Sequence, residues 1–445
     1  MILVLGGGPA GRIGAIRLAA AGKDVTLVES GGIGGQCLHY GCMPVCALND
    51  AARLVKTSQR LADLSVIDKK PTVRFKELLA KTKEIQQKIA GILDAETREA
   101  GVTLVYGKHG RTEGRQAFIG NEPVDTDAIL VATGSRPNVP NIEGIGLHGV
   151  YTTHSLWEMP KLPEDITIIG GGVVAAEFAF IFQTFGSNVR VIARTGFLKN
   201  IDPQLRSLAL QELEGVEILE NTGLLSVEGC GGVTGLRVTT EGTEGTVPAK
   251  TVLLAAGIIP RSEAVEGVRK GSSGEILVDD HMRTTVPGVY AAGDVTGPPN
   301  LTPVARYQGT IAADNILGID RAADLRFVPQ SISLGHELAF CGNGSTTAGS
   351  IAIPGPAGPG SFWDVPYRDT GLAKVRVEDD GTLAGIAIAG PGAGLITGYL
   401  AFLAKEGYSA HDFEEFIEVH PSTDGAYGLL KYVSGMLKKR KSGNH

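Results

Sequence analysis

The sequence predicts an α/β protein of several domains, and three observations support this fold class. At 445 residues the chain is too long for one ordinary hydrophobic core, which predicts two to four domains. Its 62 glycines and its 20 % of charged residues are typical of α/β domains with tight turns, and they argue against disorder. A pattern of strand, glycine turn, helix and strand occurs twice, in residues 1–30 and 165–196.

Composition also bounds the partners and the compartment. A net charge of −7 and a pI near 5.8 give no reason to expect nucleic acid as a partner. Five cysteines in so long a chain do not make a disulfide scaffold, and no signal peptide opens the sequence, so we expect a cytoplasmic protein. The apolar stretch from Leu383 is long enough to mimic a membrane span. Its glycines and Pro391 predict a buried strand, a turn and a helix instead, so no membrane partner is expected.

The first glycine turn lies at the start of the chain. Gly6, Gly8 and Gly11 form G-x-G-x-x-G between a buried strand and a helix, and the following strand ends on Glu29. Such glycines let the backbone approach a pyrophosphate, the helix start offers free N–H groups, and the carboxylate accepts ribose hydroxyls. A glycine-rich turn without a ligand is the alternative interpretation. The strand–turn–helix–strand context favours a dinucleotide site.

The second glycine turn has the same pattern with one informative difference. Gly170 and Gly172 take the first two glycine positions, and a small residue, Ala175, takes the third. At the end of the next strand Ala193 replaces the ribose-binding acid, and Arg194 follows it. Losing the acid and gaining a cation suits a 2′-phosphate, so this site favours NADP(H) over NAD(H). In the alternative, Arg194 is merely exposed and NAD(H) binds through the main chain.

Two dinucleotide sites in one chain suggest electron transfer between two nucleotides, one of them a flavin. Two further segments, carrying Gly134 and Gly257, each read as a buried strand that ends on a glycine turn. We expect them to carry the chain out of the first domain and later back into it. Another strand leads into Gly293 and Asp294, an acid on a glycine turn suited to a ribityl or phosphate contact.

The run "GGIGGQCLHYGCMPVCALND", residues 31–50, contains three cysteines: Cys37, Cys42 and Cys46. They can be a redox pair, metal ligands or small apolar residues. Pro44 suits the first turn of a helix, which places Cys42 at a helix N-terminus, where the dipole and free N–H groups favour a thiolate. A second Cys/His pair at zinc spacing is missing nearby, so we predict no metal site.

Taken together, the motifs resemble the pyridine nucleotide-disulfide oxidoreductases, the group of dihydrolipoamide dehydrogenase, glutathione reductase and mercuric reductase. The resemblance covers essentially the whole chain, and its organisation is most similar to dihydrolipoamide dehydrogenase. It implies bound FAD, a nicotinamide cofactor and a redox-active disulfide between Cys37 and Cys42. It also implies a homodimer in which His420 serves the other subunit's site. The motifs, in order, are "GGGPAG", "GGQCLHYGC", "ATGSRP", "GGGVVAAE", "AAGDVTG" and "VHP".

The resemblance further implies a role for each reacting side chain. Cys42 is the flavin-facing thiol, and Cys37 exchanges with the substrate disulfide through a mixed disulfide. His420 is the acid/base that holds Cys37 as thiolate and protonates the leaving thiol, unless it is a surface histidine without a role. Glu177 matches a carboxylate that lies near the flavin in relatives.

Three positions depart from the family pattern. Cys46 stands where most relatives have a lysine that pairs with the carboxylate of Glu177, so the field at the flavin should differ. Gly425 replaces the glutamate that orients the histidine. The adjacent Asp424 is a candidate substitute, although its side chain is expected to point differently from that of the glutamate. The C-terminal region also lacks the vicinal cysteines of a mercuric reductase.

We therefore predict three domains: FAD-binding (1–140 and 256–325), NAD(P)H-binding (141–255) and a C-terminal α+β dimerisation domain (326–445). The predicted function is FAD-dependent NAD(P)H:disulfide oxidoreductase, acting on a small-molecule disulfide or dithiol or on a protein-bound lipoyl group. An NADPH-dependent reductase of another thiol-linked substrate is the alternative within enzymes. A redox flavoprotein that binds a partner without turning over a free disulfide is the alternative from another class.

Overall fold

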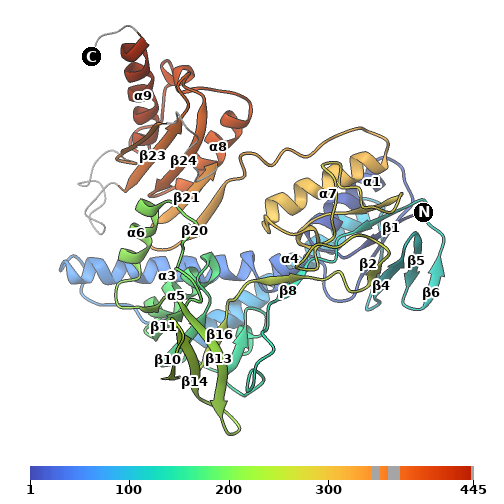
Figure 1. The fold of residues 1–445 in the computed structure, drawn as a ribbon, viewed down its shortest axis with the longest axis horizontal. Coiled ribbons are helices and arrows are strands. Elements are labelled where there is room, and N and C mark those ends of the chain that lie inside the picture. The colour runs from blue at the N-terminus through green and yellow to red at the C-terminus, as the bar shows by residue number, and fades with distance from the viewer. Residues whose placement is uncertain (343–350, 359–370, 442–445) are drawn as a thin grey trace.

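The computed structural model describes residues 1–342, 351–358 and 371–441. Three five-stranded sheets dominate it, and each sheet is the centre of one of the three bodies visible in Figure 1. Two of the sheets are parallel and carry helices, as the fold class predicts. The prediction of two Rossmann-like domains followed by an α+β unit is confirmed.

The first sheet collects strands from both ends of the predicted FAD-binding domain. Its order is β19-β7-β1-β2-β3, and all its pairings are parallel. The N-terminal helix α1 (Pro9–Ala20) and the late helix α7 (Thr302–Ile316) pack together against one face. Small residues allow this approach, since a Cβ on Gly309 would lie 2.2 Å from the carbonyl oxygen of Ala10. The strands are β1 (Ile2–Leu5), β2 (Val25–Glu29), β3 (Thr103–Tyr106), β7 (Ala128–Val131) and β19 (Val289–Ala291).

A smaller sheet covers the other face of the first one. Its order is β18-β4-β5-β6, and apolar side chains of both sheets share one hydrophobic cluster. Beside this body lie the short helix α2 (Gly35–His39) and two long helices, α3 (Cys42–Asp63) and α4 (Phe75–Glu99). The strands are β4 (Gly110–Glu113), β5 (Gln116–Ile119), β6 (Glu122–Val124) and β18 (Val265–Glu266).

The second parallel sheet has the order β12-β11-β10-β16-β9. Helix α5 (Val173–Phe185) follows β10 directly and is almost wholly buried. Helix α6 (Pro203–Glu212) and an antiparallel sheet of β13 (Thr222–Gly229), β14 (Val233–Thr240) and β15 (Thr243–Pro248) complete this body. The parallel strands are β9 (Val150–Thr152), β10 (Asp165–Ile169), β11 (Asn188–Ile192), β12 (Glu217–Leu219) and β16 (Val252–Leu254).

Two short strands lie where the chain passes between these two bodies. On the outward path β8 (Ser135–Pro137) follows β7, and on the return β17 (Ile258–Pro260) follows β16. They pair antiparallel, Ser135 opposite Pro260 and Pro137 opposite Ile258. The outward and return segments are therefore held side by side.

The third sheet is antiparallel, with the order β20-β21-β24-β23-β22. Helix α8 (Ala393–Lys405) follows β24 after a glycine turn, which confirms the strand, turn and helix predicted for the apolar stretch from Leu383. Within the described ranges, the structure has no helix long and apolar enough to cross a membrane. Helix α9 (Gly425–Lys441) ends the described chain. The strands are β20 (Gln330–Ser333), β21 (Glu337–Gly342), β22 (Ile351–Gly355), β23 (Leu372–Val377) and β24 (Leu383–Ala389).

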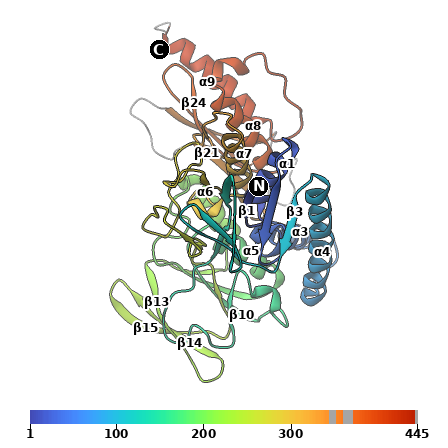
Figure 2. The same cartoon turned by 90° about the vertical axis from the view of Figure 1, so that its right-hand side faces the viewer.

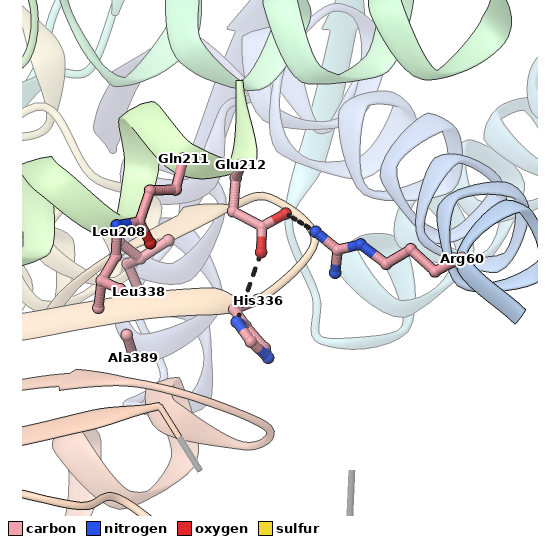
Figure 3. A pocket seen from close by; sticks show the side chains of 7 residues that line it. All are labelled: Arg60, Leu208, Gln211, Glu212, His336, Leu338 and Ala389. Atoms are coloured by element: carbon pink, nitrogen blue, oxygen red, sulfur yellow. Dashed lines mark hydrogen bonds and ion pairs between the residues drawn. The ribbon is translucent and has the colours of Figure 1, made fainter. Parts of the chain in front are cut away.

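Helix α3 is the place where the three bodies meet, as Figures 1 and 2 show from two sides. One hydrophobic cluster contains Leu48 from α3, Phe182 from α5 and Ile332 from β20. Farther along α3, Arg60 Nη2 lies 2.9 Å from the carboxylate of Glu212, the last residue of α6. The same carboxylate lies 3.4 Å from His336 Nδ1 (Figure 3). Apolar packing and the Arg60–Glu212 ion pair therefore fix α3 relative to the second and third bodies.

The first glycine turn makes a stability prediction that needs no bound ligand. Gly6 has φ 104°, and a Cβ there would lie 2.3 Å from the carbonyl oxygen of Ala132. Gly6→Ala should lower the free energy of unfolding of the flavin-free protein by about 1–3 kcal/mol or more, measured by urea denaturation. Gly8→Ala is the matched control, because a Cβ on Gly8 has no neighbour within 4 Å. Equal stability of the two variants would contradict this account of the turn.

Candidate active site

The two thiols of the predicted redox pair lie together at the start of α3. Cys37 is in α2, and Cys42 is the first residue of α3. Both are free thiols in this structure, and they are hydrogen-bonded to each other. The Cys42 Sγ also lies 3.3 Å from the hydroxyl of Thr302, the first residue of α7. Two helix N-termini therefore face the sulfur of Cys42.

The surroundings make the two thiols chemically different. The hydrogen bond from the Cys37 thiol lowers the pKa of Cys42 to about 6, aided by Thr302 and the backbone N–H of Cys42, although loss of hydration opposes this. The pKa of Cys37 is raised by its bond to Cys42 and by burial. The reduced pair therefore holds one thiolate, on Cys42, and one neutral thiol, on Cys37.

Cys46 lies on α3, one helical turn after Cys42, and Glu177 lies on the neighbouring helix α5. Glu177 Oε1 accepts the backbone N–H of Ser333 at 2.8 Å. Burial of the carboxyl raises the pKa of Glu177 to about 7, and the nearby charge of Cys42 adds to this. Loss of hydration also raises the pKa of Cys46, with the charges of Cys42 and Glu177 as further causes. Near neutral pH this region therefore holds a neutral thiol and a carboxyl that is protonated in part of the molecules.

The first glycine turn has the features needed for a dinucleotide. Glu29 accepts the backbone N–H groups of Gly7 at 2.6 Å and Gly31 at 2.7 Å, which fixes its carboxylate beside the turn. Gly8 is the N-cap of α1, and no side chain caps that helix. Gly11 is in close contact with Gly6, since a Cβ on Gly11 would lie 2.0 Å from the Gly6 carbonyl oxygen. An uncapped helix start, an open glycine and an oriented carboxylate fit the pyrophosphate and ribose of FAD.

The predicted contact at Asp294 involves partners that the sequence analysis missed. The Ser135 hydroxyl lies 2.7 Å from Asp294 Oδ2 and 3.1 Å from Gln36 Oε1. Burial raises the pKa of Asp294, and the Ser135 hydrogen bond opposes the shift. Gly293 has φ 80°, and its N–H donates to Gln308 at 2.8 Å. This places the acid beside Ser135, the residue that follows Gly134, and close to Gln36 of helix α2.

The second glycine turn repeats the first, and its surroundings are open and basic. Gly170 has φ 150°, a Cβ there would lie 2.2 Å from the carbonyl oxygen of Ala255, and Gly172 is the uncapped start of α5. Ala193 is buried, whereas Arg194 is exposed in the loop after β11. Gly257, on the return path, has φ 93° and open space around it. These residues fit a nicotinamide dinucleotide.

His420 is oriented by Asp424, the residue adjacent to the missing glutamate that the sequence offers as its substitute. Its Nδ1 lies 2.7 Å from Asp424 Oδ2, and Asp424 also accepts the N–H of Ser422 at 3.1 Å. Although burial opposes it, the His420 bond keeps the pKa of Asp424 below its usual value. The structure shows why residue 425 is glycine, because a Cβ there would lie 2.4 Å from the carbonyl oxygen of Pro356.

The structure thus brings some of the predicted residues together and leaves others apart. Cys37, Cys42 and Glu177 lie around the first turn of α3, and Asp294 lies nearby through Gln36. His420 is 59 % exposed, and among the described residues no hydrogen bond or ion pair joins it to either thiol. Thr302 and Ser135 were missed, although Ser135 directly follows Gly134, which the sequence analysis used. His39 contacts the Ile33 carbonyl within its own loop.

The thiol geometry predicts how the reduced protein reacts with iodoacetamide. The alkylation rate of Cys42 should rise with pH around a midpoint near 6, not near the 8.5 of an ordinary thiol, because only the thiolate reacts. Thr302→Val removes one stabilising hydrogen bond and should move the midpoint upward. Thr310→Val is the control, since its hydroxyl bonds only to Arg306 within α7. Identical midpoints in wild type and both variants would refute the contact with Thr302.

Comparison with known proteins agrees with this geometry. Residues 1–309 match the family described as pyridine nucleotide-disulphide oxidoreductase. A mercuric reductase of Staphylococcus aureus is 30 % identical over 74 % of this chain, but the match spans only 62 % of that protein. Dihydrolipoyl dehydrogenases of Haloferax volcanii and Geobacillus stearothermophilus are 29 % and 28 % identical over 95 % and 94 % of this chain, and over 93 % of each relative. With more than half of its length matched, the chain belongs to the pyridine nucleotide-disulfide oxidoreductases, a family of flavin-dependent enzymes.

Proposed function

We propose that this enzyme passes electrons between a nicotinamide cofactor and a low-molecular-weight or lipoyl-type disulfide through the Cys37–Cys42 pair. The observation that carries the proposal is the unequal thiol pair, with a stabilised thiolate on Cys42 and a neutral thiol on Cys37. The proposed division of the chain follows the three sheets, with residues 1–140 and 256–325 around the first, 141–255 around the second and 326–445 around the third.

The chain's own residues account for disulfide exchange. Cys37, once deprotonated by a base, attacks one sulfur of the substrate disulfide and forms a mixed disulfide, while the other substrate sulfur leaves as a thiolate that the protonated base neutralises. The Cys42 thiolate then attacks Cys37, which re-forms the Cys37–Cys42 bond and releases the second substrate thiolate. Bound FAD supplies the electron relay between the nicotinamide and the pair. In the chain, Glu29, Gly8 and Asp294 are the residues proposed to hold FAD.

His420 is the proposed base, and we propose that a second copy of the chain supplies it. Its Nδ1 is bonded to Asp424, which leaves Nε2 to exchange a proton with a thiol. Exposed apolar side chains surround this part of the third body. Leu395 on α8 is 83 % exposed, and Ile417 and Val419, just before His420, are 90 % and 79 % exposed. An apolar surface of this kind supports a homodimer contact.

The relative named mercuric reductase supports a second candidate, an NADPH-dependent reductase of another thiol-linked substrate. The exposed Arg194 beside the second glycine turn favours NADPH in either case. A partner-binding flavoprotein without disulfide turnover is the third possibility. Turnover of lipoamide, glutathione disulfide and other disulfides, each with NADH and with NADPH, separates the three.

In that panel His420→Ala should lower disulfide turnover by about 10²–10⁴-fold, the usual contribution of a positioned proton donor. FAD content and the reduction of the enzyme by NAD(P)H should stay nearly unchanged, because neither uses this histidine. His109→Ala, at an exposed histidine of the first body, is the matched control. Asp424→Asn should give a smaller loss, since it keeps a hydrogen-bonding group but removes the charge. Full disulfide turnover in His420→Ala would rule out the acid/base role.

Arg194→Ala should raise KM for NADPH and leave KM for NADH almost unchanged. A charge-assisted contact to a 2′-phosphate is worth about 1.5–3 kcal/mol, which corresponds to a KM change of roughly 10- to 150-fold. Arg237→Ala, at an exposed arginine of β14, is the control for the loss of one surface cation. Equal KM changes for the two nicotinamides would overturn the NADPH preference.

A further inference from the structure

Glu177 is an acid with thiols nearby, at a place where the family resemblance implies a lysine to neutralise its charge. It is the fifth residue of α5 and the only titratable residue of that helix. Its described hydrogen bond is the one from the Ser333 backbone N–H at 2.8 Å. One neutral N–H does not replace the hydration that a buried carboxylate loses.

The charged and titratable groups around Glu177 come almost entirely from α3. Cys42 and Cys46, one helical turn apart, both interact electrostatically with the carboxyl. The cation that acts on it is Arg53, whose guanidinium donates to the Leu334 carbonyl at 2.8 Å and to the Ser333 hydroxyl at 3.0 Å. Of the groups that shift the pKa of Glu177, Arg53 has the smallest effect.

The other elements packed against α5 add no counter-charge. Strand β20 offers the N–H of Ser333 and has no titratable side chain. Beneath α5, Asp165 of β10 accepts a hydrogen bond from Asn188 at 3.0 Å, and Arg190 of β11 pairs with Glu217 at 2.7 Å. Of the described groups, the Cys42 sulfur is therefore the one near Glu177 whose charge changes during the reaction.

We propose that Glu177 is a redox-linked proton acceptor, which takes up a proton from solvent when the Cys37–Cys42 disulfide is reduced and releases it on reoxidation. This inference rests on the redox role proposed for the pair. Reduction places a negative charge on Cys42, and that charge disfavours a second negative charge on Glu177 in a poorly hydrated site. Cys46 makes the coupling possible, because a neutral thiol at this position leaves Arg53, whose effect on the pKa of Glu177 is small, as the cation that acts on the carboxylate.

The atoms and electrons balance as follows. NAD(P)H gives up two electrons and one proton in the form of hydride, and it leaves as NAD(P)⁺. The two electrons cleave the Cys37–Cys42 bond, the proton is retained on Cys37, and Cys42 remains a thiolate. The additional proton comes from solvent and converts the Glu177 carboxylate into a carboxylic acid.

The pH range of this uptake follows from the sign of the shift. In the reduced pair the pKa of Glu177 is about 7, so the carboxyl is mostly protonated below pH 7. In the disulfide form the thiolate charge is absent, and the pKa of Glu177 is lower. Uptake is therefore greatest between the two values and disappears at more acidic and more alkaline pH, by linkage.

The test is the number of protons taken up on anaerobic two-electron reduction of the weakly buffered holoenzyme with NADPH, followed with a pH-indicator dye. At pH 7, where the Cys42 thiolate stays largely unprotonated, we expect a fraction of one proton per two electrons to be taken up by the wild type. Glu177→Gln should remove this uptake except for the small part that protonates Cys42. Infrared difference spectra should show a carboxylic acid C=O band on reduction that is missing in the same variant.

Two substitutions of Cys46 sharpen the test. Cys46→Lys puts an ammonium beside the carboxyl, which keeps it ionised in both states and should suppress uptake as Glu177→Gln does. Cys46→Ser keeps the position neutral and should behave as the wild type. If Cys46→Lys does not fold, Glu177→Gln and Cys46→Ser still decide the question.

The thiolate-to-flavin charge-transfer band, recorded in the same samples, tests the function of the thiol pair separately from the role of Glu177. If the band is missing and no dithiol forms, the proposed function of the pair fails. If the band forms but wild type and Glu177→Gln take up equal numbers of protons, the redox pair stands and the role of Glu177 is overturned.

Discussion

The stabilised thiolate at the start of α3 is the interaction on which the rest of the structure depends. A sulfur with a pKa near 6 needs unpaired donors, and the first turn of a helix is where the backbone supplies them. Pro44 occupies that turn without losing a helical hydrogen bond, and Gly41 before it has no capping side chain that would compete for the N–H groups. Thr302 adds a donor from a second helix start, so α1, α7 and the first sheet serve to bring that residue to Cys42.

The same helix transmits this constraint to the other two bodies. Asn49 and Arg53 of α3 bond to the Ser333 and Leu334 carbonyls, and Ser333 in turn donates to Glu177 on α5. Helix α3, helix α5 of the second body and the third sheet therefore meet at one β-strand end. A displacement of any of them would alter the surroundings of Glu177 and Cys46, which explains why this junction combines apolar packing with directional bonds.

The sequence predicted the parts of the site that depend on short stretches of chain. Both glycine turns, the acid at Glu29 and the helix start at Cys42 follow from local backbone requirements, and the fold class was confirmed. The contacts from Thr302 to Cys42 and from Ser135 to Asp294 join residues 260 and 159 positions apart, and no local pattern encodes them. Asp424 was offered as the substitute for the missing glutamate, but the distance of its carboxylate from His420 depends on the loop that holds both residues.

The two departures from the family pattern have different physical solutions. At position 425 the carbonyl of Pro356 excludes any side chain, and the acid is supplied one residue earlier by Asp424, so the charge beside His420 is kept. At position 46 the cation is replaced by a thiol, and no described residue supplies an equivalent charge; Arg53 is engaged with Ser333 and Leu334. A buried carboxylate that loses its counter-ion must either rehydrate or accept a proton. Because burial is the largest cause of the raised pKa of Glu177, protonation is the favoured response, and its extent depends on the charge of Cys42.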